Sequence, residues 1–143
     1  MDLSDCTLCP RSCRVNRLAG RIGYCNVTAD LFAARAALYY HEEPVISGSR
    51  GSGAVFFAGC NMGCVFCQNY AIAKAMTGTQ LSAGRLTEIF LSLQEQGAHN
   101  INLITAEHFL PQVIRSLRDA KDQGLTLPVV YNTGSYERVE AIQ

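Results

Sequence analysis

The sequence predicts an α/β fold in which parallel strands alternate with helices. Three short runs of apolar and β-branched residues, at 54–58, 101–105 and 128–132, have the length and composition of buried strands. Between them, apolar residues recur at helical spacing over 82–97 and 111–124. Strands that alternate with helices in this way form a parallel sheet with right-handed crossovers.

Residues 31–40 precede these units and are ambiguous by composition. Their alanine content favours a helix, whereas Tyr39, Tyr40 and the nearby Pro44 favour an extended segment that runs into a turn. We expect a strand. The Gly/Ser-rich stretch at 47–53 lacks the Gly-Lys-Ser/Thr ending of a phosphate loop, so we interpret it as a flexible connector.

Local signals indicate where the helices start and stop. Ser82 can cap the first helix, and Gly97 supplies its C-terminal stop. Pro111 suits the first turn of the second helix, which Gly124 ends. We expect Ser135 to cap a third helix, so that the chain supplies three strand–helix units.

Composition limits the classes of protein that the chain can represent. Its 143 residues suffice for one domain, and a hydrophobic content of 48% is that of a globular protein. The formal net charge is zero and no Lys/Arg run is present, which argues against a nucleic-acid or anionic-membrane partner. No apolar stretch approaches the roughly 20 residues of a membrane helix, and the first residues do not resemble a signal peptide.

The cysteines indicate metal binding. Seven cysteines are present, an odd number, and they fall into two clusters rather than being spread along the chain. Together with the missing signal peptide, this pattern favours metal ligation in a reducing cytoplasm over a disulfide scaffold.

The second cluster, Cys60, Cys64 and Cys67, has the spacing C-x3-C-x2-C and directly follows the strand at 54–58. Gly59 lets the backbone turn, so the thiols lie on a loop at the carboxyl end of a strand, where α/β proteins build their sites. Iron–sulfur clusters use thiolate ligands, and three ligands leave one iron of a 4Fe–4S cluster free. Buried structural thiols or a zinc site are the alternatives, but structural zinc takes four ligands.

The first cluster, Cys6, Cys9, Cys13 and Cys25, has the spacing C-x2-C-x3-C-x11-C. Four thiolates can complete the coordination of Zn²⁺ or of an iron–sulfur cluster, which would be a structural site or an electron relay. Spacing does not decide between these metals. Free thiols on a mobile N-terminal arm are the remaining alternative.

The loop at 60–67 resembles the signature of the radical S-adenosylmethionine (SAM) superfamily, C-x3-C-x-aromatic-C, with Phe66 in the aromatic position. The resemblance implies an oxidoreductase with a 4Fe–4S cluster on Cys60, Cys64 and Cys67, whose open iron is chelated by SAM. One electron then cleaves SAM to a 5′-deoxyadenosyl radical, which abstracts hydrogen from a substrate.

A wider resemblance is to the branch of pyruvate formate-lyase-activating enzymes. It implies a partner protein, a glycyl-radical enzyme, and an electron donor such as flavodoxin or ferredoxin. It is carried by the four N-terminal cysteines and by the segments Asn16-Arg17, Glu42-Glu43-Pro44, Ile46-Ser47-Gly48, Arg50-Gly51-Ser52-Gly53, Phe57 to Tyr70, Leu110-Pro111-Gln112 and Tyr131-Asn132-Thr133.

The resemblance implies a partial (β/α) barrel of about six units, of which this sequence supplies about three. We therefore expect a Cys-rich N-terminal segment and connector at 1–52, then the N-terminal half of a radical SAM partial barrel at 53–143. Such a half would leave a strand edge and an apolar helix face uncovered. The sequence would then be a fragment, a truncated reading frame, or a chain that a partner completes.

Phe66, Thr105, Glu107 and Asn132 are the candidate SAM contacts. Many relatives have a Gly-Gly-Glu motif after the second strand, where this sequence has Thr105-Ala106-Glu107-His108. Hydrogen bonds within the loops are an equal alternative for the three polar residues. Phe66 can pack on adenine or shield the cluster; a core position is the alternative, and both can hold together. For His108 we expect the commoner fate of a loop-end histidine, a surface imidazole without a role.

Two classes of function stay open at this point. The first is a radical SAM enzyme, acting on a glycine of a partner protein or on a small molecule. The second is a non-catalytic iron–sulfur or zinc protein, such as an electron carrier. Glu42 and Glu43 can meet a substrate in the first class, although exposure to solvent is the expectation for both.

Overall fold

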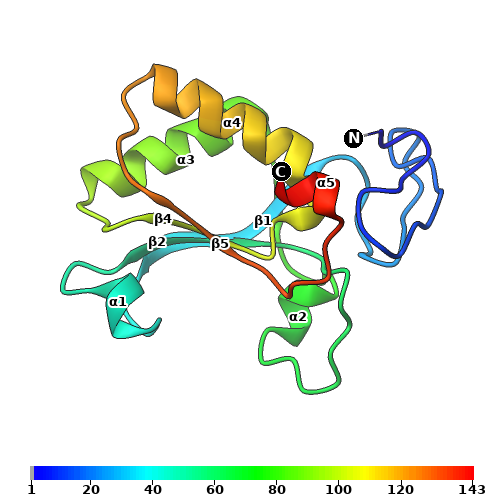
Figure 1. Cartoon of the computed structure of the whole chain (residues 1–143), viewed down its shortest axis with the longest axis horizontal. Helices are drawn as coiled ribbons and strands as arrows, with labels where there is room; N and C mark the ends of the chain where they lie inside the picture. The colour runs from blue at the N-terminus through cyan, green and yellow to red at the C-terminus, as the bar shows by residue number, and fades with distance from the viewer. Residues whose placement is uncertain (1) are drawn as a thin grey trace.

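The computed structural model describes residues 2–143 and has an α/β fold (Figure 1). Over these residues, five strands form one mixed sheet in the order β3-β1-β2-β4-β5. The strands are β1 (Leu31–Tyr39), β2 (Ser52–Phe57), β3 (Thr79–Leu81), β4 (Ile101–Ile104) and β5 (Val129–Asn132). The helices are α1 (Pro44–Ser47), α2 (Tyr70–Ala73), α3 (Ala83–Glu95), α4 (Leu110–Asp122) and α5 (Val139–Ile142), with a 3-10 turn η1 (Glu107–Phe109).

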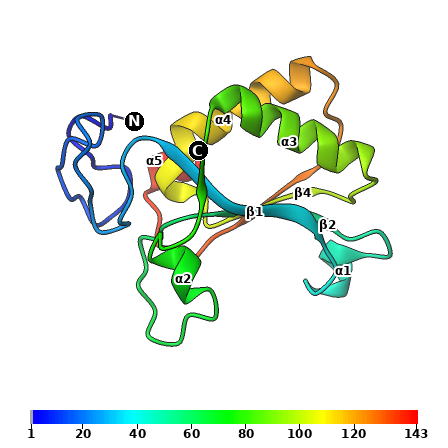
Figure 2. The same ribbon diagram turned by 180° about the vertical axis from the view of Figure 1, so that it is seen from behind.

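The three predicted strand–helix units are present. Strands β2, β4 and β5 are parallel, with Val55 opposite Leu103 and Leu103 opposite Tyr131. Helices α3 and α4 lie side by side on one face of the sheet, as both ribbon views show (Figure 1, Figure 2). Phe90 of α3 and Val113 of α4 are fully buried in the main core beneath them. This packing forms part of the main core, and its apolar burial stabilises the fold.

The prediction of a strand at 31–40 is confirmed, but its pairing was not foreseen. Strand β1 runs antiparallel to β2 and carries β3 on its other side. The edge of β2 that a three-stranded sheet would leave free is therefore covered by β1, and residues 31–39 belong to the same sheet as the later strands. The sheet is open and does not close into a barrel.

The helix signals were correct for α3 and α4 but not for α5. Ser82 caps α3 by accepting a hydrogen bond from the backbone N–H of Arg85 at 3.0 Å. Ser135, the predicted cap of the last helix, instead has a φ of 60° in a tight turn, and its N–H bonds to the Thr133 hydroxyl at 3.1 Å. The last helix consequently begins after Arg138.

Residues 2–30 form turns without a helix or strand and lie beside one end of the sheet (Figure 1). Their own apolar cluster consists of Leu3, Cys6 and Leu8, separate from the main core. Within residues 2–143, no helix combines the length and the apolar character that crossing a bilayer requires.

Candidate functional site

The cysteine loop starts where β2 ends. Gly59 has a φ of +87°, and its N–H bonds to the carbonyl of Ile72 at 2.8 Å. A Cβ at this position would lie 2.5 Å from the carbonyl oxygen of Cys25. Glycine is therefore required both by the backbone conformation and by the close approach of the N-terminal segment.

The three thiols of Cys60, Cys64 and Cys67 are free and partly exposed on this loop. The N–H of Met62 points at the Cys60 sulfur at 3.4 Å, as expected for a sulfur that can act as an anionic ligand. Burial, helped by the charge of Glu107, raises the pKa of the Cys60 thiol. A bound cation would counteract this effect by favouring the thiolate.

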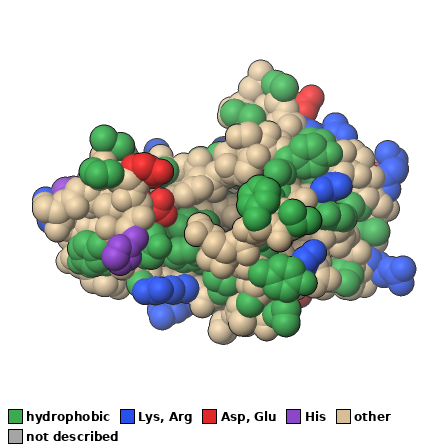
Figure 3. All heavy atoms as spheres, turned by 90° about the horizontal axis from the view of Figure 1, so that it is seen from below, with side chains coloured by type: hydrophobic (Ala, Val, Ile, Leu, Met, Phe, Trp, Pro, Cys, Tyr) green, Lys and Arg blue, Asp and Glu red, His purple; other side chains and the backbone are tan. Residues whose placement is uncertain are grey.

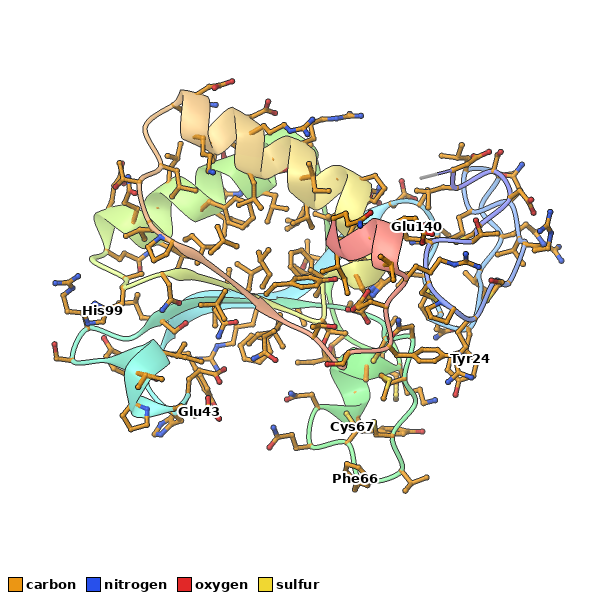
Figure 4. The ribbon with its side chains drawn as sticks, in the orientation of Figure 1. Tyr24, Glu43, Phe66, Cys67, His99 and Glu140 are labelled. Atoms are coloured by element: carbon orange, nitrogen blue, oxygen red, sulfur yellow. The ribbon has the colours of Figure 1, made fainter. Side chains whose placement is uncertain are left out.

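Phe66 lies at the tip of the loop, next to Cys67 and away from the sheet (Figure 4). Its side chain is 86% exposed and that of Val65 is 99% exposed. Phe66 is therefore not a core aromatic, which removes one of its two interpretations and leaves the adenine or cluster contact as a prediction.

A hollow of about 480 Å³ lies on the face of the sheet opposite α3 and α4. The loop contributes Gln68 and Asn69 to its lining, and β4 and β5 contribute Thr105 and Asn132 at their carboxyl ends. Thr105 donates its N–H to the carbonyl of Asn132 at 2.9 Å, so the two predicted contacts are neighbours. A hollow of this size can take a nucleoside-sized ligand.

Strand β1 contributes charged and aromatic groups to this hollow that sequence reasoning missed. Arg35 and Tyr39 line it, as does His41 just beyond the strand. Glu42, named above as a residue that can meet a substrate, also lines it. Figure 3 shows acidic and histidine side chains toward one end of this side of the molecule, and apolar side chains interspersed with Lys and Arg over the rest. Glu43 is exposed, as expected, whereas Glu42 faces the hollow.

Glu107 and His108 are buried and do not line the hollow. They are 1% and 2% exposed, so the expectation of a surface imidazole at His108 is wrong. The ring Nε2 of His108 lies 2.8 Å from the Ala58 carbonyl, which fixes the end of β2. Neither carboxylate oxygen of Glu107 has a hydrogen-bond partner among the described residues.

The N-terminal segment braces the cysteine loop through Arg11, a second feature that sequence reasoning missed. Its guanidinium donates to the carbonyls of Asn61 and Met62 at 2.9 and 3.0 Å. The same guanidinium lies 3.8 Å from the ring centre of Tyr24 and 5.2 Å from that of Tyr136. The position of Arg11 between two cysteines of the first cluster was the available signal.

The two cysteine clusters are also joined directly. The N–H of Cys60 bonds to the carbonyl of Cys25 at 3.3 Å. A separate bond ties the loop to the C-terminal part of the chain, because Asn61 donates its side-chain amide to the Tyr136 carbonyl at 2.9 Å. Figure 4 shows Tyr24 on the flank of the N-terminal segment that faces the loop carrying Cys67.

Across residues 2–143, no three His, Cys, Asp or Glu side chains converge closely enough to hold a metal ion as they stand. Whether the loop suits an iron–sulfur cluster is therefore judged from the chemistry of its thiol ligands. Three free thiols share an eight-residue loop, and one sulfur already accepts a backbone N–H. Each thiol can be redirected by rotation about one side-chain torsion. The donor set fits thiolate ligation.

Comparison with known proteins finds one distant relative. The chain is 26% identical over 145 residues to the uncharacterized protein MJ0674 of the archaeon Methanocaldococcus jannaschii. The match covers 96% of this chain but 41% of that protein, so the chain spans about two fifths of the length of the relative. No family model matches the chain, and no solved structure matches it.

Proposed function

We propose that the chain is the N-terminal half of a radical SAM oxidoreductase. The observation that carries this proposal is the loop with Cys60, Cys64 and Cys67. It supplies three free thiols at the carboxyl end of a parallel strand, and its next residues line a hollow of about 480 Å³. Three thiols suit a cluster that keeps one coordination position for a ligand, whereas an electron carrier or a zinc module needs four.

In this proposal Cys60, Cys64 and Cys67 hold a 4Fe–4S cluster. When bound, the cluster supplies the electron and the open iron position that reductive cleavage of SAM to a 5′-deoxyadenosyl radical requires. Arg11 and the Cys25 carbonyl fix the first part of the loop by hydrogen bonds to its backbone. Phe66, exposed at the tip, can cover one side of the bound ligand.

The chain's contribution to SAM binding lies in the polar lining of the hollow. Thr105 and Asn132 present hydroxyl and amide groups beside the loop, and Gln68 and Asn69 present two further amides. Such groups can hydrogen-bond the ribose and adenine of SAM. Glu107 is proposed as a contact by the resemblance, but its carboxylate is buried, lies 3.8 Å from the His108 ring nitrogen Nδ1, and does not line the hollow.

We propose more specifically that the full enzyme is an activase. It would install a glycyl radical on a partner enzyme in the cytoplasm, with flavodoxin or ferredoxin as electron donor. The open sheet supports it, because an unclosed hollow admits a loop of a large protein substrate. We propose that in the longer protein the missing units extend the sheet beyond β5 into a partial barrel. This assignment rests on family analogy.

Product analysis tests the proposal. The longer archaeal relative, 41% of which matches this chain, is reconstituted anaerobically and mixed with SAM, reductant and a glycyl-radical enzyme from the same organism. Formation of 5′-deoxyadenosine together with a doublet EPR signal on the partner supports an activase. Deoxyadenosine without a protein radical points to a small-molecule substrate. Absence of deoxyadenosine under every condition contradicts the enzyme proposal and favours the electron carrier.

A further inference from the structure

The four N-terminal cysteines, which lie between residues 6 and 25, line one small cavity. Its volume is about 20 Å³, and its lining includes the buried Arg17 as well as the four thiols of Cys6, Cys9, Cys13 and Cys25. All four thiols are free, and Cys6 and Cys25 are buried. A cavity of this size holds about one water-sized particle, so it suits a single ion and not an iron–sulfur cluster.

The backbone around Cys13 is shaped to its sulfur. The N–H of Tyr24 points at the Cys13 sulfur at 3.3 Å. A Cβ on Gly23 would lie 3.2 Å from the same sulfur, so the absence of a side chain there lets the chain pass close by. On the other side, Ser12 has a φ of 45° and closes a turn onto the Cys9 carbonyl at 3.1 Å. N–H groups directed at sulfur are the usual outer contacts of metal-bound thiolates.

Arg17 gives an independent reason to expect an anionic group in this cavity. Its side chain is 1% exposed, and among residues 2–143 it forms no ion pair with a carboxylate. Its guanidinium bonds to the carbonyls of Thr28 and His108 and lies 3.9 Å from the Cys6 sulfur. A buried cation without a counter-charge is costly, and four thiolates around one divalent ion carry two negative charges in total.

The N-terminal segment, residues 2–30, also lacks the regular structure that would hold it in place. Residues 2–30 contain no helix or strand, and their buried apolar side chains are Leu3, Cys6 and Leu8 in a small cluster and Cys25 and Val27 in the main core. A region with so little apolar burial is usually held by disulfides or a metal, and these thiols are free.

We propose that Cys6, Cys9, Cys13 and Cys25 bind one Zn²⁺ ion, with Arg17 as the buried counter-charge. The four sulfurs do not converge as they stand, and rotation of each thiol about its single side-chain torsion would direct it to a common centre. The site is separate from the proposed cluster on Cys60, Cys64 and Cys67. It fastens the segment that carries Arg11, and thereby the brace on the cysteine loop.

The test removes the other cysteines so that the two sites are independent. The whole chain with Cys60→Ser, Cys64→Ser and Cys67→Ser is produced in medium containing zinc and iron, and its metals and acid-labile sulfide are measured. We expect one zinc per chain, no sulfide, and four thiols protected from alkylation until a chelator is added. Iron with sulfide in place of zinc, or no bound metal with all four thiols reactive, would overturn the proposal.

Cobalt replacement gives a second measurement, which reports the geometry of the bound ion. Co²⁺ added to the same chain should give the absorption of tetrahedral tetrathiolate cobalt. Arg17→Met should weaken Co²⁺ binding by about tenfold or more, whereas Arg17→Lys, which keeps the charge, should weaken it less. Arg14→Met is the matched control, because Arg14 is exposed, pairs with Asp5 and does not line the cavity. Octahedral cobalt spectra, or equal effects at the two arginines, would also overturn the proposal.

Discussion

Gly59 is the residue at which strand β2 turns into the cysteine loop, and its replacement tests that junction. We expect Gly59→Ala to lower the free energy of unfolding by about 2–4 kcal/mol, because a Cβ adds both backbone strain and a clash. The clash would be with the Cys25 carbonyl at 2.5 Å and with Val27 at 2.9 Å.

Gly124 provides the control for this substitution. It also has a positive φ, of +100°, but a Cβ there would meet no atom within 4 Å. Gly124→Ala should therefore show the backbone cost alone, about 1 kcal/mol. Urea unfolding of both variants makes the comparison, and equal losses would show that the contact between Gly59 and the N-terminal segment is not formed.

Glu137 should make stability depend on pH. Burial raises the pKa of its carboxyl above the ordinary value, although its bond from the Thr133 hydroxyl acts the other way. The folded chain then binds this proton more tightly than the unfolded chain, so stability falls as pH rises from the unfolded pKa through the folded one. Glu137→Gln should be more stable than the wild type at about pH 7 and similar to it at about pH 4.

Urea midpoints at the two pH values measure this effect, and Glu140→Gln serves as the control. Glu140 lies on the exposed side of α5 (Figure 4) and should change little at either pH. A destabilisation by Glu137→Gln at about pH 7 would mean that the ionised carboxylate is stabilising.

For individual residues, the sequence predicted that Cys60, Cys64 and Cys67 lie on a loop after a strand, because the cysteine spacing and the preceding strand are local features. It missed Arg11 and misjudged His108, since each acts on a segment about fifty positions away in the chain, at Asn61 and Ala58 respectively. The side chains of β1 in the hollow were missed for the same reason.

The capping of α3 gives a prediction at the scale of one element. Ser82→Ala removes the acceptor for the N–H of Arg85 and should lower the free energy of unfolding by about 1 kcal/mol. Ser82→Asp keeps an acceptor and should retain most of the stability. Thermal unfolding followed by circular dichroism compares them, and equal loss in both variants would show that the hydroxyl does not cap the helix.

Elements whose signals are local were predicted well. The parallel strands and helices α3 and α4 follow from periodicity and from caps and stops within a few residues. The antiparallel pairing of β1 with β2 and β3 was not predicted. Which strands pair depends on contacts between distant segments, and no local sequence signal reports these contacts. The start of α5 was misplaced because the Thr133 hydroxyl bonds to the N–H of Ser135 in a turn there.

For the molecule as a whole, Arg11 joins the N-terminal segment to the cysteine loop. Arg11→Ala removes two charge-assisted hydrogen bonds to the loop. We expect amide hydrogen exchange over 60–67 to accelerate by about tenfold, with little change in α3 and α4. Arg14→Ala, which removes the exposed ion pair with Asp5, should leave this exchange unchanged.

Mass spectrometry of peptides from the metal-free chain measures this exchange. Unchanged protection of the loop in Arg11→Ala would mean that the two segments move independently. The loop would then have to be ordered by its own contacts.

The most direct test of the proposed function is the EPR spectrum of the reduced cluster with and without SAM. This chain and the archaeal relative are both reconstituted anaerobically with iron and sulfide. The proposal predicts an oxygen-labile 4Fe–4S signal in each, absent in Cys64→Ala of this chain and retained in Val65→Ala, whose side chain is exposed in the same loop. It further predicts that SAM changes the spectrum of the relative, because SAM ligates the open iron. A cluster signal that persists in Cys64→Ala, or a spectrum of the relative that SAM leaves unchanged, would contradict it.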